Sequence, residues 1–270
     1  MRITVVVATY NRPDALAAVL DGYAHQDERD FEVIVADDGS TDEVREVVTL
    51  HARTAPFPIT HLWHEDRGFR ATIMRNRGLA ASRAEYLIYT DADCVPPHDF
   101  IARHRRLAEP GHFLAGNRVL LSESFTEEVL RRHLPVYEWA VARWLPIRLR
   151  GDINRWLPLL RLPDSPLRKL APQRWRGVKT CNLSAWRSDL IAVNGFDEIY
   201  AGRWGLEDTD LVIRLLHSGV KHKSARCAAP VYHLWHKEAD RSGISENQQL
   251  LDEVITSGRI RARIGVDQYL

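Results

Sequence analysis

Between residues 3 and 90 the chain alternates between short apolar runs and longer stretches with helical spacing, and this alternation limits the fold more than any other feature. The runs that we expect to be strands are Ile3–Ala8, Phe31–Ala36, Ile59–Trp63 and Tyr86–Thr90. The stretches that we expect to be helices are Pro13–Ala24, Thr41–Ala52 and Ala71–Ala81. The pattern predicts an α/β fold, in which a mostly parallel sheet has helices on both faces.

Polar residues collect where these predicted strands end. Ligands of open parallel sheets bind outside the carboxyl ends of the strands, so this rim is the expected site. The residues that fall there are Thr9, Tyr10, Asp37, Asp38, Asp66 and the run Asp91-Ala92-Asp93. We therefore expect one binding site to draw on all four predicted strands.

Asp91 and Asp93 are the most informative pair at this rim. Residues two apart in a strand point to the same side, so both carboxylates can reach one divalent cation. Mg²⁺ or Mn²⁺ bound in this way keeps positions open for substrate phosphates, which favours a diphosphate ligand. The other interpretation is an acidic turn that caps a helix or faces water.

Further elements are expected in the second half of the chain. They are a helix at Asp99–Leu107, strands at Phe113–Leu121, Val178–Ala185 and Ala228–Trp235, and helices at Asp208–Ser218 and Glu246–Arg263. The stretch from Trp139 to Lys179 differs in composition, because it holds ten Lys and Arg against two acidic residues, a net charge of +8 in a chain of net charge +1. We expect the region 134–176 to be a helical insertion.

Two more motifs lie beyond this insertion: Trp204-Gly205-Leu206-Glu207-Asp208, and the pair His233 and His236. Together with the rim residues they form an ordered set that resembles the family-2 glycosyltransferases of the GT-A fold. The C-terminal part resembles the catalytic region of the β-1,4-galactosyltransferases, although Leu206 stands where those enzymes have glycine. The resemblance covers nearly the whole chain.

The resemblance implies an inverting, metal-dependent transfer of a hexose or N-acetylhexosamine from a UDP-sugar to a glycan acceptor, in the synthesis of a bacterial cell-surface polysaccharide or lipopolysaccharide. It also implies a single domain, with a nucleotide-sugar half at 1–110, an acceptor half at 111–245 and a C-terminal helix within 246–270. The expected nucleotide contacts are Thr9, Tyr10, Arg12, Asp38, Asp66, Arg75, Asn76, Asp91, Ala92 and Asp93. For Asp38 the alternative is a turn and helix cap, and for Arg75 and Asn76 it is a solvated helix face.

The same resemblance assigns the metal and the base. Asp93 would ligate Mn²⁺ or Mg²⁺, Asp91 would contact the metal or the ribose, and His233 or His236 would complete the coordination. Inverting transfer needs a base for the acceptor hydroxyl, a role we expect for Asp208, with Glu207 positioning the acceptor. Asp208 could instead cap a helix, as we expect Asp210 to do.

Several other functions fit the sequence less well. A sugar-nucleotidyltransferase or a dinucleotide oxidoreductase would need a glycine-rich loop after a strand, and Ala8-Thr9-Tyr10-Asn11-Arg12 contains no glycine. A processive synthase would need spanning helices and a Gln-x-x-Arg-Trp motif, whereas Gln173-Arg174-Trp175 has a different spacing. A non-catalytic carbohydrate-binding or scaffold protein on the same fold remains the main alternative.

The expected location is the cytoplasm. Three cysteines without a Cys-x-x-Cys pair, and an N-terminus unlike a signal peptide, favour a reducing compartment. The arginines, leucines and tryptophans of the insertion suit an anionic membrane surface, which suggests peripheral attachment to the inner face of a bacterial membrane and a lipid-linked acceptor. A solvated lid over the acceptor is the other interpretation. We expect no nucleic-acid partner.

Overall fold

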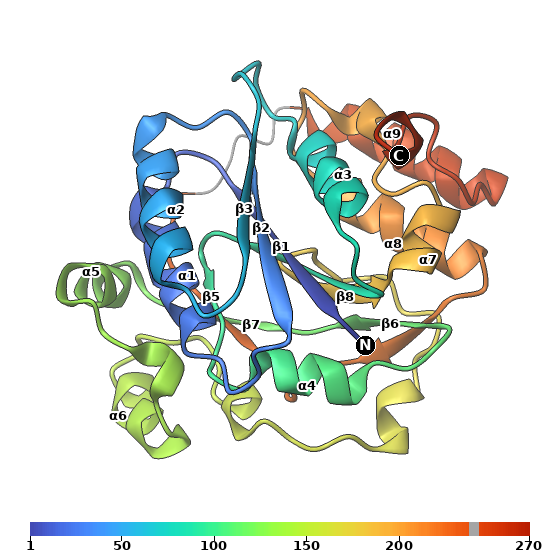
Figure 1. The fold of residues 1–270 in the computed structure, drawn as a ribbon. Coiled ribbons are helices and arrows are strands. Elements are labelled where there is room, and N and C mark those ends of the chain that lie inside the picture. The colour runs from blue at the N-terminus through green and yellow to red at the C-terminus, as the bar shows by residue number, and fades with distance from the viewer. Residues whose placement is uncertain (238–242) are drawn as a thin grey trace.

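The computed structural model describes residues 1–237 and 243–270 and centres on one seven-stranded sheet (Figure 1). In spatial order its strands are β3 (Ile59–Trp63), β2 (Phe31–Asp37), β1 (Ile3–Thr9), β4 (Tyr86–Asp91), β8 (Asn182–Trp186), β6 (His112–Ala115) and β9 (Lys221–Ser224). The first four are parallel to one another, and β8 runs antiparallel to both of its neighbours. The predicted mostly parallel sheet is confirmed.

Helices cover both faces of this sheet, as the alternation predicted. On one face lie α1 (Pro13–Ala24) and α2 (Asp42–Thr54), and α3 (Ala71–Ala81) lies on the other (Figure 1). The side chains of β1 alternate between the two cores, since Val5 and Val7 pack with residues of α1 while Val6 packs with Met74 of α3. β1 is almost entirely apolar because both of its faces are buried.

One predicted strand, Phe113–Leu121, is two strands in the structure. The chain leaves the large sheet after Ala115 and continues as β7 (Arg118–Leu120), which joins β5 (Cys94–Val95) and β10 (Val231–His233) in a small three-stranded sheet. Gly116 permits the change of direction, because a Cβ there would lie 2.3 Å from the side chain of Asn182. The strands predicted at Val178–Ala185 and Ala228–Trp235 are also too long. In the structure they are Asn182–Trp186 and Val231–His233.

The helices of the second half are α4 (Phe100–Leu107), α5 (Glu123–Arg132), α6 (Trp144–Leu149), α7 (Arg187–Ala192), α8 (Glu207–His217) and α9 (Ile244–Ser257). The C-terminal helix was predicted to end at Arg263, and this end is wrong. α9 ends at Ser257, because Gly258 adopts a left-handed φ of +67°. Beyond it the backbone is irregular apart from a 3₁₀ turn at Val266–Gln268. Sequence reasoning did not predict α5, α7, β5 or β9.

The insertion 134–176 is made of short 3₁₀ turns and α6 rather than of longer helices. Arg168 is buried and donates hydrogen bonds to the carbonyl oxygens of Leu162, Pro163, Ser224 and Arg226. Arg161 forms an ion pair of 2.9 Å with Asp99, which directly precedes α4. These contacts fasten the insertion to the body of the protein.

Two of the insertion's tryptophans are core residues, which corrects the expectation that its tryptophans face outward. Trp139 and Trp144 are buried and pack together against Phe125 and Tyr232, whereas Trp156 is exposed. No helix in the described ranges is long and apolar enough to cross a membrane.

Candidate active site

Two adjoining cavities open at the carboxyl ends of β1 and β4. The larger has a volume of about 870 Å³ and the smaller about 520 Å³. The residues that line both are Arg75, Asp91, Arg118, Trp204, His233 and His236. A ligand in one cavity would therefore meet a ligand in the other across this shared wall.

The larger cavity gathers most of the residues that we expected around a nucleotide. Those that line it are Thr9, Tyr10, Arg12, Asp38, Arg75, Asp91, Ala92 and Asp93. Asp66 is not on the wall but accepts a hydrogen bond of 3.0 Å from the Tyr10 hydroxyl, so it holds that ring in place. The Thr9 hydroxyl is buried without a hydrogen-bond partner in the described structure.

Asn76 is the exception, and its prediction as a nucleotide contact is wrong. Its side chain is fully buried, donates to the Phe196 carbonyl and to Glu198, and accepts from the Phe196 N–H. These bonds hold the turn that follows Gly195, where a Cβ would lie 2.3 Å from the Asn76 amide oxygen. Asn76 thus supports the fold behind the site.

Asp38 lies at the end of β2 with both carboxylate oxygens engaged. His64 lies 2.7 Å from one oxygen, and the backbone N–H of Arg70 donates to the other at 2.8 Å. Burial raises the pKa of Asp38, and these two contacts act against the rise. Neither contact involves α2, so the alternative of a cap for that helix is wrong.

Asp93 and the two histidines form a compact group. One oxygen of Asp93 lies 3.2 Å from Nε2 of His236 and 3.6 Å from Nε2 of His233. The Cys94 thiol lies 3.2 Å from the other oxygen. Burial acts to raise the pKa of Asp93, but the histidine contacts outweigh it and hold the pKa at about 2.

This group fits a divalent cation. The ligand atoms of Asp93, Cys94 and His233 lie within 4.8 Å of one another, and His236 approaches the same carboxylate oxygen. Carboxylate oxygen with imidazole nitrogen is a donor set that Mn²⁺ accepts. β10 supplies His233 and pairs with β5 directly after Asp93, with His233 opposite Cys94, so strand register brings the group together.

Asp91 has a different partner. Nη2 of Arg75 lies 3.0 Å from Oδ1 of Asp91, and Nη1 of the same guanidinium lies 3.4 Å from Oε1 of Glu207. Arg75 is buried, so the solvated-helix alternative is wrong for this residue. That Asp91 ligates the metal stays a prediction.

Glu207 and Asp208 begin α8 and line the smaller cavity. Burial and the neighbouring Asp208 raise the pKa of Glu207 to about 7, although the Arg75 charge acts in the opposite direction. Oε2 of Glu207 is buried and has no partner among the described residues. Asp208 lies 3.6 Å from the ammonium group of Lys179. Asp210, by contrast, points into the core, where it forms an ion pair of 2.6 Å with Arg214.

Leu206 precedes this helix in a left-handed conformation, with φ of +74°. Glycine adopts such a backbone without strain, whereas a branched side chain there is unfavourable. Leu206 nevertheless adopts this left-handed backbone, so the turn keeps a conformation that a glycine would also adopt. The Leu206 side chain packs instead against the cluster formed by Ile213, Leu251 and Val254.

Comparison with known proteins shows which family the chain belongs to. The family model for glycosyl transferase family 2 matches residues 4–162, more than half of the chain. The chain belongs to glycosyl transferase family 2. A second model, for the N-terminal domain of galactosyltransferase, matches residues 169–237 and thus includes Glu207, Asp208 and both histidines.

Among curated family members, validoxylamine A glucosyltransferase of Streptomyces hygroscopicus subsp. jinggangensis is 31% identical over 227 residues, which cover 81% of this chain and 52% of that protein. The chain thus spans about half of that relative. Two solved structures share the fold at a TM-score of 0.60. TarS 1–349 of S. aureus is 17% identical, and the match covers 100% of this chain and 68% of the TarS chain. The mannosyltransferase PcManGT of Pyrobaculum calidifontis, in complex with GDP-Man and Mn²⁺, is 21% identical, and the match covers 88% of this chain and 58% of that chain.

Sequence reasoning missed several residues of this site, and three of them lie beside the proposed metal group or in the shared wall. Arg118 lies in the shared wall, Cys94 contacts Asp93, and Trp235 lines the smaller cavity. Cys94 and Trp235 could have been found from their positions beside predicted metal ligands. Arg118 has no such signal, because only the pairing of β7 with β10 brings it to the cavities.

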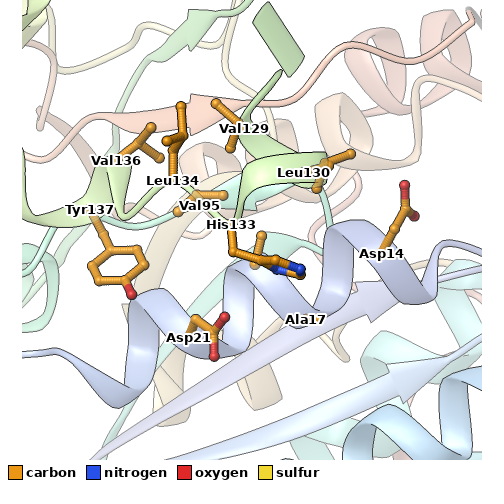
Figure 2. Close-up of a pocket in the computed structure, with 11 residues that line it drawn as sticks. Asp14, Ala17, Asp21, Val95, Val129, Leu130, His133, Leu134, Val136 and Tyr137 are labelled. Atoms are coloured by element: carbon orange, nitrogen blue, oxygen red, sulfur yellow. The ribbon is translucent and has the colours of Figure 1, made fainter. Parts of the chain in front are cut away.

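A third cavity, of about 110 Å³, shares no residue with the other two. Figure 2 shows it between α1 and the end of α5, where the His133 ring lies over α1 and apolar side chains form the opposite wall. Its small size and separation exclude it from the candidate active site.

Proposed function

We propose that this chain is an inverting, metal-dependent glycosyltransferase that moves a hexose or N-acetylhexosamine from a UDP-sugar to a glycan acceptor. The observation that carries the proposal is the shared wall, where the Asp93–histidine group of the larger cavity adjoins the Glu207–Asp208 pair of the smaller one. In this proposal the donor occupies the larger cavity and the acceptor the smaller. Residues 1–110 then supply most of the donor contacts, and residues 111–245 most of the acceptor contacts.

The base in this reaction is Asp208. As the acceptor oxygen bonds to the anomeric carbon, the bond from that carbon to the diphosphate breaks and its electron pair leaves with the diphosphate. The acceptor's proton passes to the Asp208 carboxylate, and attack from the face opposite the leaving group inverts the configuration. Glu207 lines the smaller cavity and its Oε2 has no hydrogen-bond partner among the described residues, which supports its role in positioning the acceptor.

Asp93, His233 and His236 would hold Mn²⁺ or Mg²⁺, and the mixed oxygen and nitrogen donors favour Mn²⁺. A bound divalent cation supplies charge stabilisation for the departing diphosphate. Asp38 and Tyr10 lie farther along the donor cavity, where they would receive the uracil base. Arg75 keeps Asp91 and Glu207 in fixed orientations from behind the site.

The function is tested by nucleotide release from a panel of UDP-sugars and GDP-mannose, with Mn²⁺ and a range of glycan acceptors. We expect turnover with at least one UDP-sugar and a product of inverted anomeric configuration. The absence of turnover, together with no nucleotide-induced rise in melting temperature, would favour the carbohydrate-binding scaffold. Release of pyrophosphate from a sugar-1-phosphate and UTP would favour the nucleotidyltransferase.

We further infer that the insertion binds an anionic membrane surface, which would bring the site to a lipid-linked acceptor. Nine of the nineteen exposed large apolar side chains among the described residues lie between residues 141 and 170. Arg143, Arg148, Arg150 and Arg155 are exposed among them. Asn154 of the insertion is hydrogen-bonded to Leu120, which lines the proposed acceptor cavity. The exposed apolar and basic side chains of the insertion therefore lie close to that cavity.

Changing Arg148, Arg150 and Arg155 together to Glu should abolish co-sedimentation with anionic vesicles. Each basic residue near such a surface contributes about 1 kcal/mol, and charge reversal replaces attraction by repulsion. Binding by the wild type should weaken as salt is raised. The matched control changes Arg53, Arg83 and Arg106 to Glu, because these arginines are exposed elsewhere and have no ion pair in the described structure. Equal binding of the wild type to neutral and anionic vesicles would leave the insertion as an acceptor lid.

A further inference from the structure

Arg118 lies in the wall between the two cavities, and its guanidinium has no partner among the described residues. It lies on β7 beside β10, is partly buried, and lines both the larger and the smaller cavity. Within residues 1–237 and 243–270, no hydrogen bond or ion pair to its guanidinium is present. A guanidinium that is partly removed from water and unpaired is costly, so its position needs an explanation.

The other cations of the two cavities all have carboxylate partners. Arg12 lies 3.0 Å from Asp14, Arg203 lies 3.3 Å from Glu246, and Lys179 lies 3.6 Å from Asp208. Arg75 is shared between Asp91 and Glu207. Arg118 thus differs from the four paired cations in having its charge and its donor fork available to a ligand.

The surroundings of Arg118 indicate which ligand group it faces. Burial raises the pKa of Asp91, and the charges of Arg75 and Arg118 both oppose that rise, so Arg118 lies within electrostatic reach of the carboxylate that ends β4. Burial lowers the pKa of His233, and the charge of Arg118 lowers it further. Arg118 therefore lies near the proposed metal group, in the wall that the two cavities share.

We propose that Arg118 binds the sugar-linked phosphate of the donor diphosphate and stabilises it as the leaving group. This assignment rests on the proposed function, because it requires the donor in the larger cavity and the acceptor in the smaller. The anomeric carbon must lie where the two cavities meet, and the phosphate attached to it is the part of the diphosphate nearest to that point. When the bond from the anomeric carbon to the diphosphate oxygen breaks, that oxygen keeps the electron pair, and the guanidinium fork matches phosphate oxygens.

The test compares the binding of UDP and UMP by calorimetry in the presence of Mn²⁺. Arg118→Gln should weaken UDP binding about tenfold or more and UMP binding by no more than about twofold, since UMP lacks the contacted phosphate. Arg118→Lys should fall between, because it keeps the charge but loses the fork. Arg106→Gln is the matched control, since Arg106 is an exposed arginine of α4 that lies outside both cavities and has no ion pair in the part of the chain that the structure describes.

Two results would overturn the assignment. Unchanged UDP affinity in Arg118→Gln with weaker binding of the acceptor would make Arg118 an acceptor residue. Equal losses for UDP and UMP would mean that it contacts the nucleoside side or only supports the fold. A wild type that binds GDP rather than UDP would contradict the proposed donor alone, and the same comparison with GDP and GMP would then test Arg118.

Discussion

Asp208→Asn should lower kcat by about 10²–10⁴ while the dissociation constant of the donor changes little. The amide keeps the size of the side chain, but it cannot accept the acceptor's proton. Asp208 lies in the smaller cavity and outside the larger one, so the donor contacts should remain intact. Steady-state kinetics and calorimetry with UDP measure the two effects separately.

A matched control separates chemistry from helix stability. Asp42 lies in the first turn of α2, as Asp208 does in α8, but it is exposed and outside both cavities. Asp42→Asn should therefore lose a similar helix-dipole interaction, of about 0.3–1 kcal/mol, with no effect on kcat. A product that retains the donor's anomeric configuration would contradict the inverting mechanism whatever the kinetics of the variant.

Removal of the metal, or of its main ligand, should abolish turnover. EDTA should stop the wild type, Mn²⁺ should restore it, and Asp93→Ala should stay inactive at any Mn²⁺ concentration that restores the wild type. The reason is that both histidines contact the Asp93 carboxylate, so its loss removes the oxygen donor around which the proposed metal group is arranged. Binding of Mn²⁺, followed by electron paramagnetic resonance without substrate, should weaken in parallel.

The fold of this variant needs a check of its own. Asp93→Ala should keep the circular dichroism spectrum of the wild type, because the side chain lies at the rim of the sheet and outside the main cores. Asp27→Ala is a suitable control, since Asp27 is an exposed carboxylate that also contacts a histidine, His98, at 3.0 Å. Full activity of the wild type in EDTA would exclude the proposed metal and, with it, the role of both histidines.

The first half of the fold was predictable because its signals are local. β1, β2 and β4 are buried along almost their whole length, so each appears as a largely apolar run, and α1 and α3 have the predicted bounds. β3 lies at the edge of the sheet and is only partly buried. Errors concentrate in the second half, where the chain passes from one sheet to another at Gly116 and Asn117. That change depends on the partner strands, and the run from Phe113 to Leu121 does not encode it.

The site divides in a similar way. Residues at the ends of parallel strands, such as Thr9, Asp38 and Asp93, could be placed together because topology brings those ends to one rim. Asn76 was assigned wrongly because helical spacing does not tell the outward face of α3 from the face that supports the Phe196 turn. Arg118 could not be found, since it reaches the site only through the β7–β10 pairing.

The Arg75 bridge has a consequence for how the specificity of this protein can be altered. One buried guanidinium holds Asp91, which lines both cavities, and Glu207, which lines the proposed acceptor cavity, so we expect a substitution at any of the three to disturb both substrates at once. Directed changes are more separable at the far ends, at Tyr10 for the donor or at Leu120 and Ile244 for the acceptor, because each of these lines only one cavity. Libraries built on those two sets should give effects on donor and acceptor choice that combine additively, and new pairings could then be assembled from separately selected halves.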